Sequence, residues 1–159
     1  MKKAVLLSIR PEWCELIAIG KKTVEVRKTA PKLQTPFKCY IYETQGSYRA
    51  GNEAYNFIVK GSGRRKVIGE FICDAIEKHW LNSVGCRNLS EQSCVPASEL
   101  HIYAQPKEWL FGWHISNLVI YDTPKELSDF YTEAYRTFDC PPLVKMKRPP
   151  QSWMYVEEL

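Results

Sequence analysis

Three ionisable side chains lie close together near the N-terminus, where the sequence changes its period. Lys22, Glu25 and Arg27 follow Gly20, which ends a segment with helical spacing. From Thr23 onward apolar and polar residues alternate as in a β-strand, so Glu25 and Arg27 point to one side about 7 Å apart. The carboxylate could accept from an amino group while the cations meet phosphate or base acceptors. The alternative is an ion pair on a solvated strand face.

A strand and a helix must position this cluster. Residues 4–9 are almost all apolar and predict a short buried strand. Pro11 follows at the first position of a predicted helix, where its missing N–H costs nothing. Apolar residues at helical spacing continue from Trp13 to Ile19, and Gly20 is a typical helix end. The chain therefore enters the charged strand directly from a helix.

These segments resemble the ASCH domains of the PUA-like superfamily. The resemblance is carried by Leu7-Ser8-Ile9-Arg10-Pro11, Gly20-Lys21-Lys22-Thr23-Val24-Glu25-Val26-Arg27-Lys28 and Tyr42-Glu43-Thr44. The chain looks closest to the prophage-like members, with which it shares Gly112-Trp113-His114-Ile115, Tyr121-Asp122-Thr123-Pro124 and Pro149-Pro150-Gln151-Ser152-Trp153. The segments follow the family order over nearly the whole chain.

The resemblance implies a ligand pocket beside the first helix and the charged strand. Related PUA-like domains bind RNA or read modified bases, so the implied partner is RNA or a nucleotide-like ligand. Ser8 and Arg10, at the end of the first strand, either contact the ligand or only begin the helix. The ligand-binding residues carried over from the motifs are Lys22, Glu25, Arg27, Tyr42, Glu43 and Thr44.

Hydrolysis is an alternative that the same resemblance raises. Some small ASCH proteins resemble amidohydrolases that remove the acyl group of N4-acetylcytidine with a threonine nucleophile, a lysine and a glutamate. Lys22 stands at the position of the lysine, but Glu25 replaces the threonine, and Thr23 is displaced by two residues. A carboxylate does not simply replace a hydroxyl that a lysine activates, so this activity is the weaker expectation.

Two further functions remain open at this stage. Other ASCH proteins are similar to metal-assisted ribonucleases, and Glu25, Glu43, Glu70 and Asp74 could supply oxygen ligands, although their spacing does not require a metal. A protein-interaction module is the alternative without a ligand. We expect no cofactor and no resident metal, because the sequence contains no Walker loop, dinucleotide fingerprint or zinc signature.

The remaining chain predicts an α+β domain that is mostly strands. Strands are predicted at residues 38–43, 67–76, 112–121 and 152–157, and a capping box at Thr123–Glu126 predicts a short helix. Residues 45–64 are rich in glycine and predict a loop insertion, whereas residues 77–111 show no dominant period. Pattern and resemblance agree on one domain over residues 1–159, a PUA-like, small, mostly antiparallel β-barrel with short flanking helices.

The densest basic run follows the predicted insertion. It comprises Lys60, Arg64, Arg65 and Lys66, which either track a nucleic-acid backbone or decorate a soluble hairpin tip. The formal charge of +4 permits a polyanionic partner without requiring one. Six cysteines without a CxxC pair indicate reduced thiols. No segment has the length of a membrane span, and we expect a cytoplasmic protein that does not bind membranes.

Overall fold

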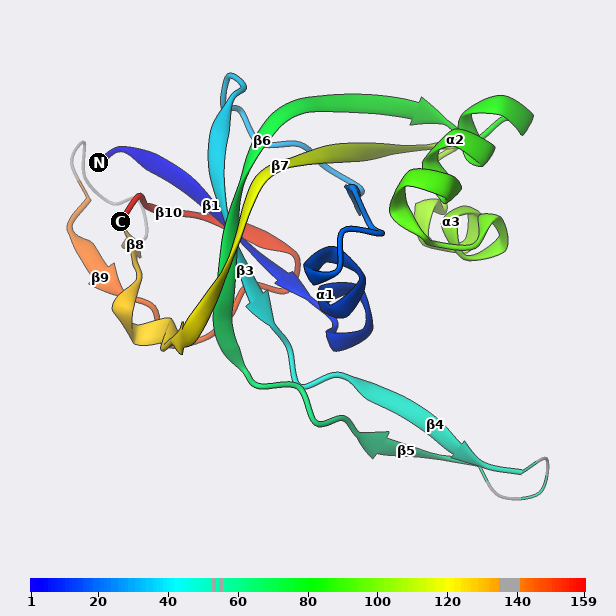
Figure 1. Cartoon of the computed structure of the whole chain (residues 1–159), viewed down its shortest axis with the longest axis horizontal. Coiled ribbons are helices and arrows are strands. Elements are labelled where there is room, and N and C mark those ends of the chain that lie inside the picture. Colours follow the sequence, from blue (N-terminus) through cyan, green and yellow to red (C-terminus); the bar gives the residue numbers. More distant parts are fainter. Residues whose placement is uncertain (53, 55, 135–140) are drawn as a thin grey trace. The chain divides into compact units, whose positions relative to one another are not determined.

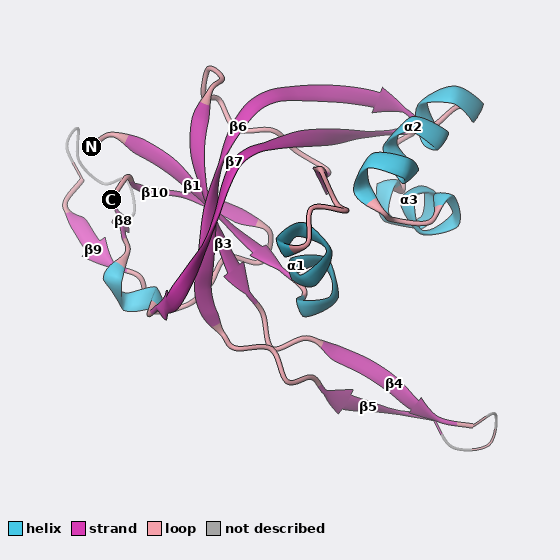
Figure 2. Ribbon diagram, in the orientation of Figure 1, coloured by secondary structure: helices cyan, strands magenta, loops and turns pink. Residues whose placement is uncertain are grey.

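The computed structural model describes residues 1–52, 54, 56–134 and 141–159. Its strands are β1 (Lys3–Ile9), β2 (Val24–Arg27), β3 (Phe37–Glu43), β4 (Ser47–Gly51), β5 (Asn56–Lys60), β6 (Lys66–Trp80), β7 (Trp109–Lys125), β8 (Tyr131–Glu133), β9 (Leu143–Lys145) and β10 (Trp153–Glu157). Its helices are α1 (Pro11–Ala18), α2 (Ser83–Ser93), α3 (Ala97–Ala104) and the 3₁₀ turn η1 (Leu127–Asp129). The predicted α+β class with a majority of strands is therefore confirmed (Figures 1 and 2).

The described chain forms two compact units. Unit 1 consists of Met1–Cys14, Tyr40–Gly69 and Tyr121–Leu159, and unit 2 consists of Glu15–Cys39 and Glu70–Ile120. The largest sheet of the described part has the strand order β10-β1-β3-β6-β7-β2. The single-domain assignment stays a prediction.

Unit 1 is built around the antiparallel pair of β1 and β10. Ala4 lies opposite Val156 and Leu6 lies opposite Met154, so alternate side chains of both strands enter one core. Each fully buried aliphatic side chain contributes about 1.5–3 kcal/mol. The buried core residues of this unit are Ala4, Leu6, Tyr40, Tyr42, Val67, Phe130, Met146 and Val156.

Unit 2 packs β2 against α2 and α3. Val24 and Val26 are buried on the face that meets the helices, as the period of two predicts. The helical members of this core are Cys86, Leu89, Leu100 and Ala104. On the other side β2 pairs with β7, where Glu25 lies opposite Trp113. This arrangement holds the charged strand between a helical layer and a strand.

Local signals explain how the helices begin and end. Pro11 starts α1, and Gly20, with φ of 79°, takes the left-handed conformation that follows the helix. The side chain of Asn82 accepts a hydrogen bond of 2.8 Å from the backbone N–H of Gly85 and so caps α2. Residues 77–111, which showed no dominant period, contain the end of β6, the helices α2 and α3, and the start of β7.

Two sequence expectations need correction. Residues 45–64, predicted as a loop insertion, contain the antiparallel strands β4 and β5, because Tyr48, Phe57 and Ile58 favour extended backbone (Figure 1). The predicted capping box at Thr123–Glu126 is wrong, since residues up to Lys125 belong to β7. The capping box forms one turn later, from Glu126 to Asp129, and starts only η1.

Closure of the sheet into a barrel is not confirmed. The pairing order of the described strands begins at β10 and ends at β2, so the sheet is open in this order. The barrel stays a prediction. Within the described residues, the helices lack the length and apolar character that are needed to cross a membrane.

Candidate functional site

The predicted cluster of Lys22, Glu25 and Arg27 is a connected ion-pair network in unit 2. Lys22 Nζ lies 3.3 Å from Oε2 of Glu25. Arg27 Nη2 lies 2.9 Å from the other oxygen, Oε1. The Lys22 ammonium also donates a hydrogen bond of 2.8 Å to the backbone carbonyl of Ser93, at the end of α2. The structure therefore brings together the three residues that the sequence predicted.

This network is buried, contrary to the alternative of a solvated strand face. The side chains of Lys22, Glu25 and Arg27 expose 1%, 7% and 7% of their surface. Removing charges from water is costly unless each is paired, which explains why both oxygens of Glu25 face a cation. Two cations and one carboxylate leave the cluster with one net positive charge. A buried cluster of this sign favours an anionic ligand over a cationic one.

Tyr103 on α3 joins the cluster and was missed in the sequence. Burial and, to a smaller extent, the negative charge of Glu25 raise the pKa of the Tyr103 hydroxyl. The positive charge of Arg27 and a hydrogen bond with the Lys28 backbone lower that pKa. Tyr103 is 39% exposed, and Lys28 Nζ lies 5.1 Å from the centre of its ring. An aromatic ring and a surface cation thus extend the buried cluster to solvent. The segment around Tyr103 has no dominant period, so no local pattern indicated this contact.

Thr23 immediately precedes β2, although the alternation predicted that the strand begins at this residue. Its backbone N–H and its hydroxyl both meet the carbonyl oxygen of Gln92, at 3.0 and 3.4 Å. Thr23 is exposed, whereas Glu25, within β2, is buried. The described contacts tie its hydroxyl to α2 and not to Lys22.

The other predicted ligand residues belong to unit 1. Glu43 accepts a hydrogen bond of 2.8 Å from the backbone N–H of Arg64. Burial raises the pKa of the Tyr42 hydroxyl, against the influence of Arg65. The backbone N–H of Thr44 donates to the carbonyl of Ile9 at 2.9 Å. Tyr42, Glu43 and Thr44 therefore meet the loop that carries the basic run.

Ser8 and Arg10 have separate surroundings in the same unit. The Ser8 hydroxyl donates a hydrogen bond of 2.6 Å to the carbonyl of Pro150. Arg10 Nη1 forms an exposed ion pair with Glu12 Oε1 at 3.6 Å. Arg10 lies just before α1 and Glu12 lies in its first turn. These contacts explain both residues as parts of the strand-to-helix connection.

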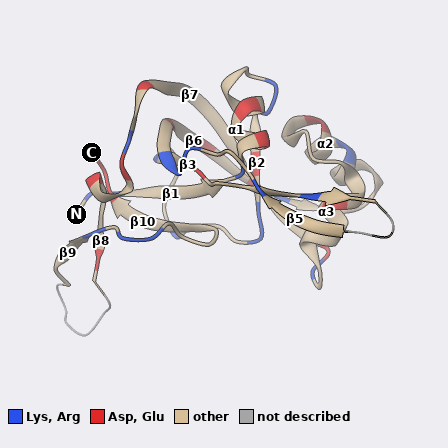
Figure 3. Ribbon diagram, turned by 90° about the horizontal axis from the view of Figure 1, so that it is seen from below, with Lys and Arg blue, Asp and Glu red and all other residues tan. Residues whose placement is uncertain are grey.

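The basic run divides into paired and surface cations. Lys66 forms an ion pair with Glu126, at 2.6 Å, and Arg64 lies 3.8 Å from Glu43. Lys60 ends β5, and Arg65, with φ of 56°, stands in the loop before β6. Figure 3 shows the Lys and Arg residues of the described chain in blue and the Asp and Glu residues in red. Two of the four predicted backbone-contacting residues thus also have an acidic partner within the protein.

The described residues contain no group of three His, Cys, Asp or Glu side chains arranged for a metal ion. Glu70 lies 3.1 Å from Lys38 as an ion pair, and Asp74 is exposed. Cys14, Cys39, Cys73 and Cys86 are buried thiols, Cys94 is a half-buried thiol, and Cys140 lies outside the described residues. Burial raises the pKa of the Cys39 thiol well above its usual range.

Comparison with known proteins gives a family model and solved structures. The ASCH protein of Zymomonas mobilis is 20% identical, with a TM-score of 0.66 over 99% of this chain and 90% of that chain. A form of it in which a tyrosine is replaced by phenylalanine is 19% identical, with a TM-score of 0.67 over 99% and 92%. A comparison with curated proteins gave no match. A family model described as the ASCH domain matches residues 7–121, well over half of the sequence, and the chain therefore belongs to the ASCH domain family.

Proposed function

We propose that this ASCH domain binds RNA or a nucleotide-like ligand at the charged cluster of Lys22, Glu25 and Arg27. The observation that carries the proposal is the net positive charge of a buried, fully connected ion-pair network. A protein retains such a network at a cost in desolvation, and a phosphate or base that shares its charges would offset that cost. The family resemblance points to the same ligand class.

Tyr103 and Lys28 supply the contacts that this ligand would meet first. The ring of Tyr103 can stack against a base, and Lys28 can contact a phosphate. Glu25 would then accept a hydrogen bond from an exocyclic amino group, while Arg27 meets a phosphate or a base acceptor. Glu43 and the basic run of unit 1 would add contacts if a longer RNA reaches them.

Binding is better supported than hydrolysis of an N4-acylated cytidine. Oε1 of Glu25 lies 2.9 Å from Arg27, Oε2 is buried 3.3 Å from Lys22 Nζ without a hydrogen bond, and the Thr23 hydroxyl is directed to Gln92. A hydroxyl nucleophile needs an activating base within hydrogen-bond reach, and the contact described for the Thr23 hydroxyl is with a backbone carbonyl and not with Lys22. A metal-dependent ribonuclease has no supporting cluster among the described residues.

The test compares two neighbouring lysines. Lys22→Met removes the buried cation and Lys21→Met removes an exposed one, so the second variant is a matched control. Affinities for labelled single-stranded RNA and for a panel of nucleosides and nucleotides are measured together, with mass analysis for any product. Far-UV circular dichroism and denaturation establish that each variant is folded.

We expect Lys22→Met to lose binding by tenfold or more, since a charge-assisted contact is worth about 1.5–3 kcal/mol, whereas Lys21→Met binds like the wild type. Arg27→Lys, which keeps the charge but not the two-pronged geometry, is expected to weaken binding as well. Unchanged affinity in the folded Lys22→Met variant would refute this site. A change in ligand mass that depends on Lys22 would establish a hydrolase in its place.

A further inference from the structure

A cluster of aromatic and basic side chains lies where β6 ends and β7 begins, in unit 2 (Figure 1). Trp80 is the last residue of β6 and Trp109 is the first residue of β7, and their ring centres are 5.1 Å apart. Lys78 Nζ lies 4.6 Å from the centre of the Trp80 ring and 4.2 Å from that of Trp109. Lys107 Nζ lies 5.4 Å from the Trp109 ring. Two indoles and two ammonium groups therefore form one cluster.

This cluster is open to solvent, unlike the buried Lys22 network. Trp80 is 51% exposed, which is unusual for the largest apolar side chain. The lysines explain part of the arrangement, since an ammonium over an indole gains cation–π attraction. They do not explain why half of the Trp80 surface remains in water. An exposed aromatic beside cations is the composition of a surface that stacks bases and contacts phosphates.

A cavity of about 580 Å³ adjoins Trp80. This volume falls in the range of small-molecule sites, which runs from about 300 to 1,000 Å³. Its walls are polar or aromatic for the most part and include one carboxylate: Trp80, Leu81, Asn82, His101, Gln105, Pro106, Lys107 and Glu108. The amide and imidazole groups can donate to or accept from the edge of a base, and Lys107 can contact its phosphate.

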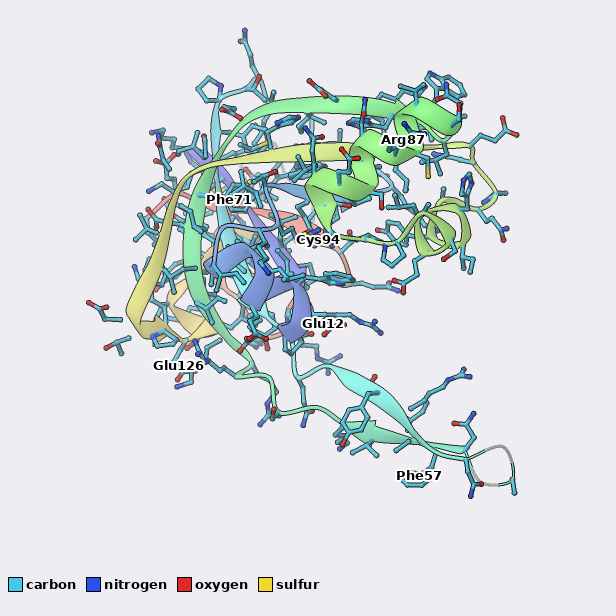
Figure 4. All side chains as sticks on the ribbon, turned by 45° about the vertical axis from the view of Figure 1, so that its right-hand side comes forward. Glu12, Phe57, Phe71, Arg87, Cys94 and Glu126 are labelled. Carbon is cyan, nitrogen blue, oxygen red and sulfur yellow. The ribbon has the colours of Figure 1, made fainter. Side chains whose placement is uncertain are left out.

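The cavity walls are fixed by contacts of their own. The side chain of Asn82 caps α2, and its amide nitrogen is not needed for that bond. His101 Nε2 lies 3.6 Å from Sγ of Cys86, and the backbone oxygen of Gln105 accepts from Lys28 at 3.3 Å. Arg87, labelled in Figure 4, stands on the same helix as Cys86 but is not among the residues that line this cavity. A preformed pocket with an aromatic wall needs little ordering when a ligand binds.

We propose that this site binds an unpaired base of single-stranded RNA, with the base stacked on Trp80 and inserted into the cavity and its phosphate near Lys107. The proposal rests on the proposed RNA binding and names the substrate class. A paired base has both faces covered by its neighbours in the duplex, whereas a single strand can splay a base onto an aromatic ring. The exposed lysines favour this polyanion over an apolar protein segment.

The experiment measures anisotropy of a short fluorescein-labelled single-stranded RNA, and of its blunt duplex, with the full chain. Trp80→Ala removes the stacking surface, and Trp80→Phe keeps a ring at the same position. Lys107→Ala removes the phosphate contact. Lys125→Ala is the matched control, because Lys125 also lies 5.1 Å from an aromatic ring, that of Tyr121, but lines none of the cavity walls.

We expect Trp80→Ala to weaken single-strand binding about tenfold, while Trp80→Phe retains most of the affinity. Lys107→Ala is expected to weaken binding and to reduce its salt dependence by about one phosphate contact, and Lys125→Ala to change neither. The duplex should bind more weakly than the single strand to the wild type. Because Trp80 is half exposed, its replacement leaves the buried core in place.

The outcomes separate this proposal from the Lys22 site. If Trp80→Ala binds like Trp80→Phe, the stacking site is refuted, even where Lys22→Met abolishes binding. If Trp80→Ala weakens binding and Lys22→Met does not, the stacking site stands and the charged cluster falls. Equal affinity for duplex and single strand would refute the preference for unpaired bases. A wild-type protein that binds no RNA would refute both.

Discussion

Glu25→Gln is the sharpest test of the charge arrangement inside unit 2. Glutamine has almost the same shape as glutamate, so the substitution removes charge and little volume. Glu25 is the single carboxylate between Lys22 and Arg27, at 3.3 and 2.9 Å. Without it the buried cluster changes from one net positive charge to two, and the cations repel each other without a counter-charge.

The magnitude follows from burial. Breaking a buried ion pair by removing one partner costs about 3–5 kcal/mol, because it leaves uncompensated charge in a medium of low dielectric. For a chain of this length that loss lowers the melting temperature on the order of 10 °C. Lys22→Met should cost less, since Glu25 and Arg27 then remain as a one-to-one pair. The exposed pair of Arg10 and Glu12 is the control, and Glu12→Gln should cost less than about 1 kcal/mol.

Urea denaturation followed by tryptophan fluorescence measures these differences. The midpoint and the slope of each curve give the free energy of unfolding, and an unchanged slope shows that the same surface is exposed. The expected order of stability is wild type, Glu12→Gln, Lys22→Met and Glu25→Gln. If Glu25→Gln unfolds at the same urea concentration as Glu12→Gln, the cluster is solvated in solution and the reasoning from burial fails.

Three further predictions concern other parts of the chain. Burial lowers the pKa of His79, so the unfolded chain binds more protons than the folded chain below about pH 6.5. The free energy of unfolding should therefore fall as the pH falls from there toward the lower pKa of the folded state. If the dependence of that free energy on pH is the same in His79→Gln as in the wild type, this reasoning is contradicted. Gly63→Ala should destabilise the protein by about 1–3 kcal/mol, because a Cβ there would clash with the backbone oxygen of Thr44, and a wild-type melting temperature would argue against that contact. Burial raises the pKa of Cys39, so iodoacetamide should alkylate half-exposed Cys94 before Cys39, and mass mapping that finds the reverse order would show the Cys39 site to be open.

The local pattern of the chain predicted several of the described elements. The apolar run before Pro11, the helical spacing up to Gly20 and the alternation from Thr23 gave β1, α1 and β2 in their places. The predicted strands at residues 38–43 and 152–157 are β3 and β10. These signals work because periodicity and turn residues act within a few positions of each other. The family motif also placed Lys22, Glu25 and Arg27 together correctly.

Longer elements and the hairpin were harder to predict. β6 and β7 extend beyond the predicted residues 67–76 and 112–121, since pairing along a sheet stabilises extended backbone whose own sequence has no clear period. The strands β4 and β5 were hidden by flanking glycines, although exposed Tyr48 on β4 favours a strand, as does exposed Phe57 on β5 (Phe57 is labelled in Figure 4). Glycine content indicates turns, but it does not measure the length of the strands between them.

What the sequence alone determined is the first three elements β1, α1 and β2, the family and the chemistry of the charged strand. Only the tertiary structure decided that this charge is buried, that Tyr103 reaches it from α3, and that Trp80 and Trp109 meet beside a cavity. These pairs are brought together by packing between segments that are distant in the chain, and no local period reports such a contact. Burial changes an ordinary pair of charges into a network with a large electrostatic energy, because the low dielectric of the interior strengthens every interaction within it.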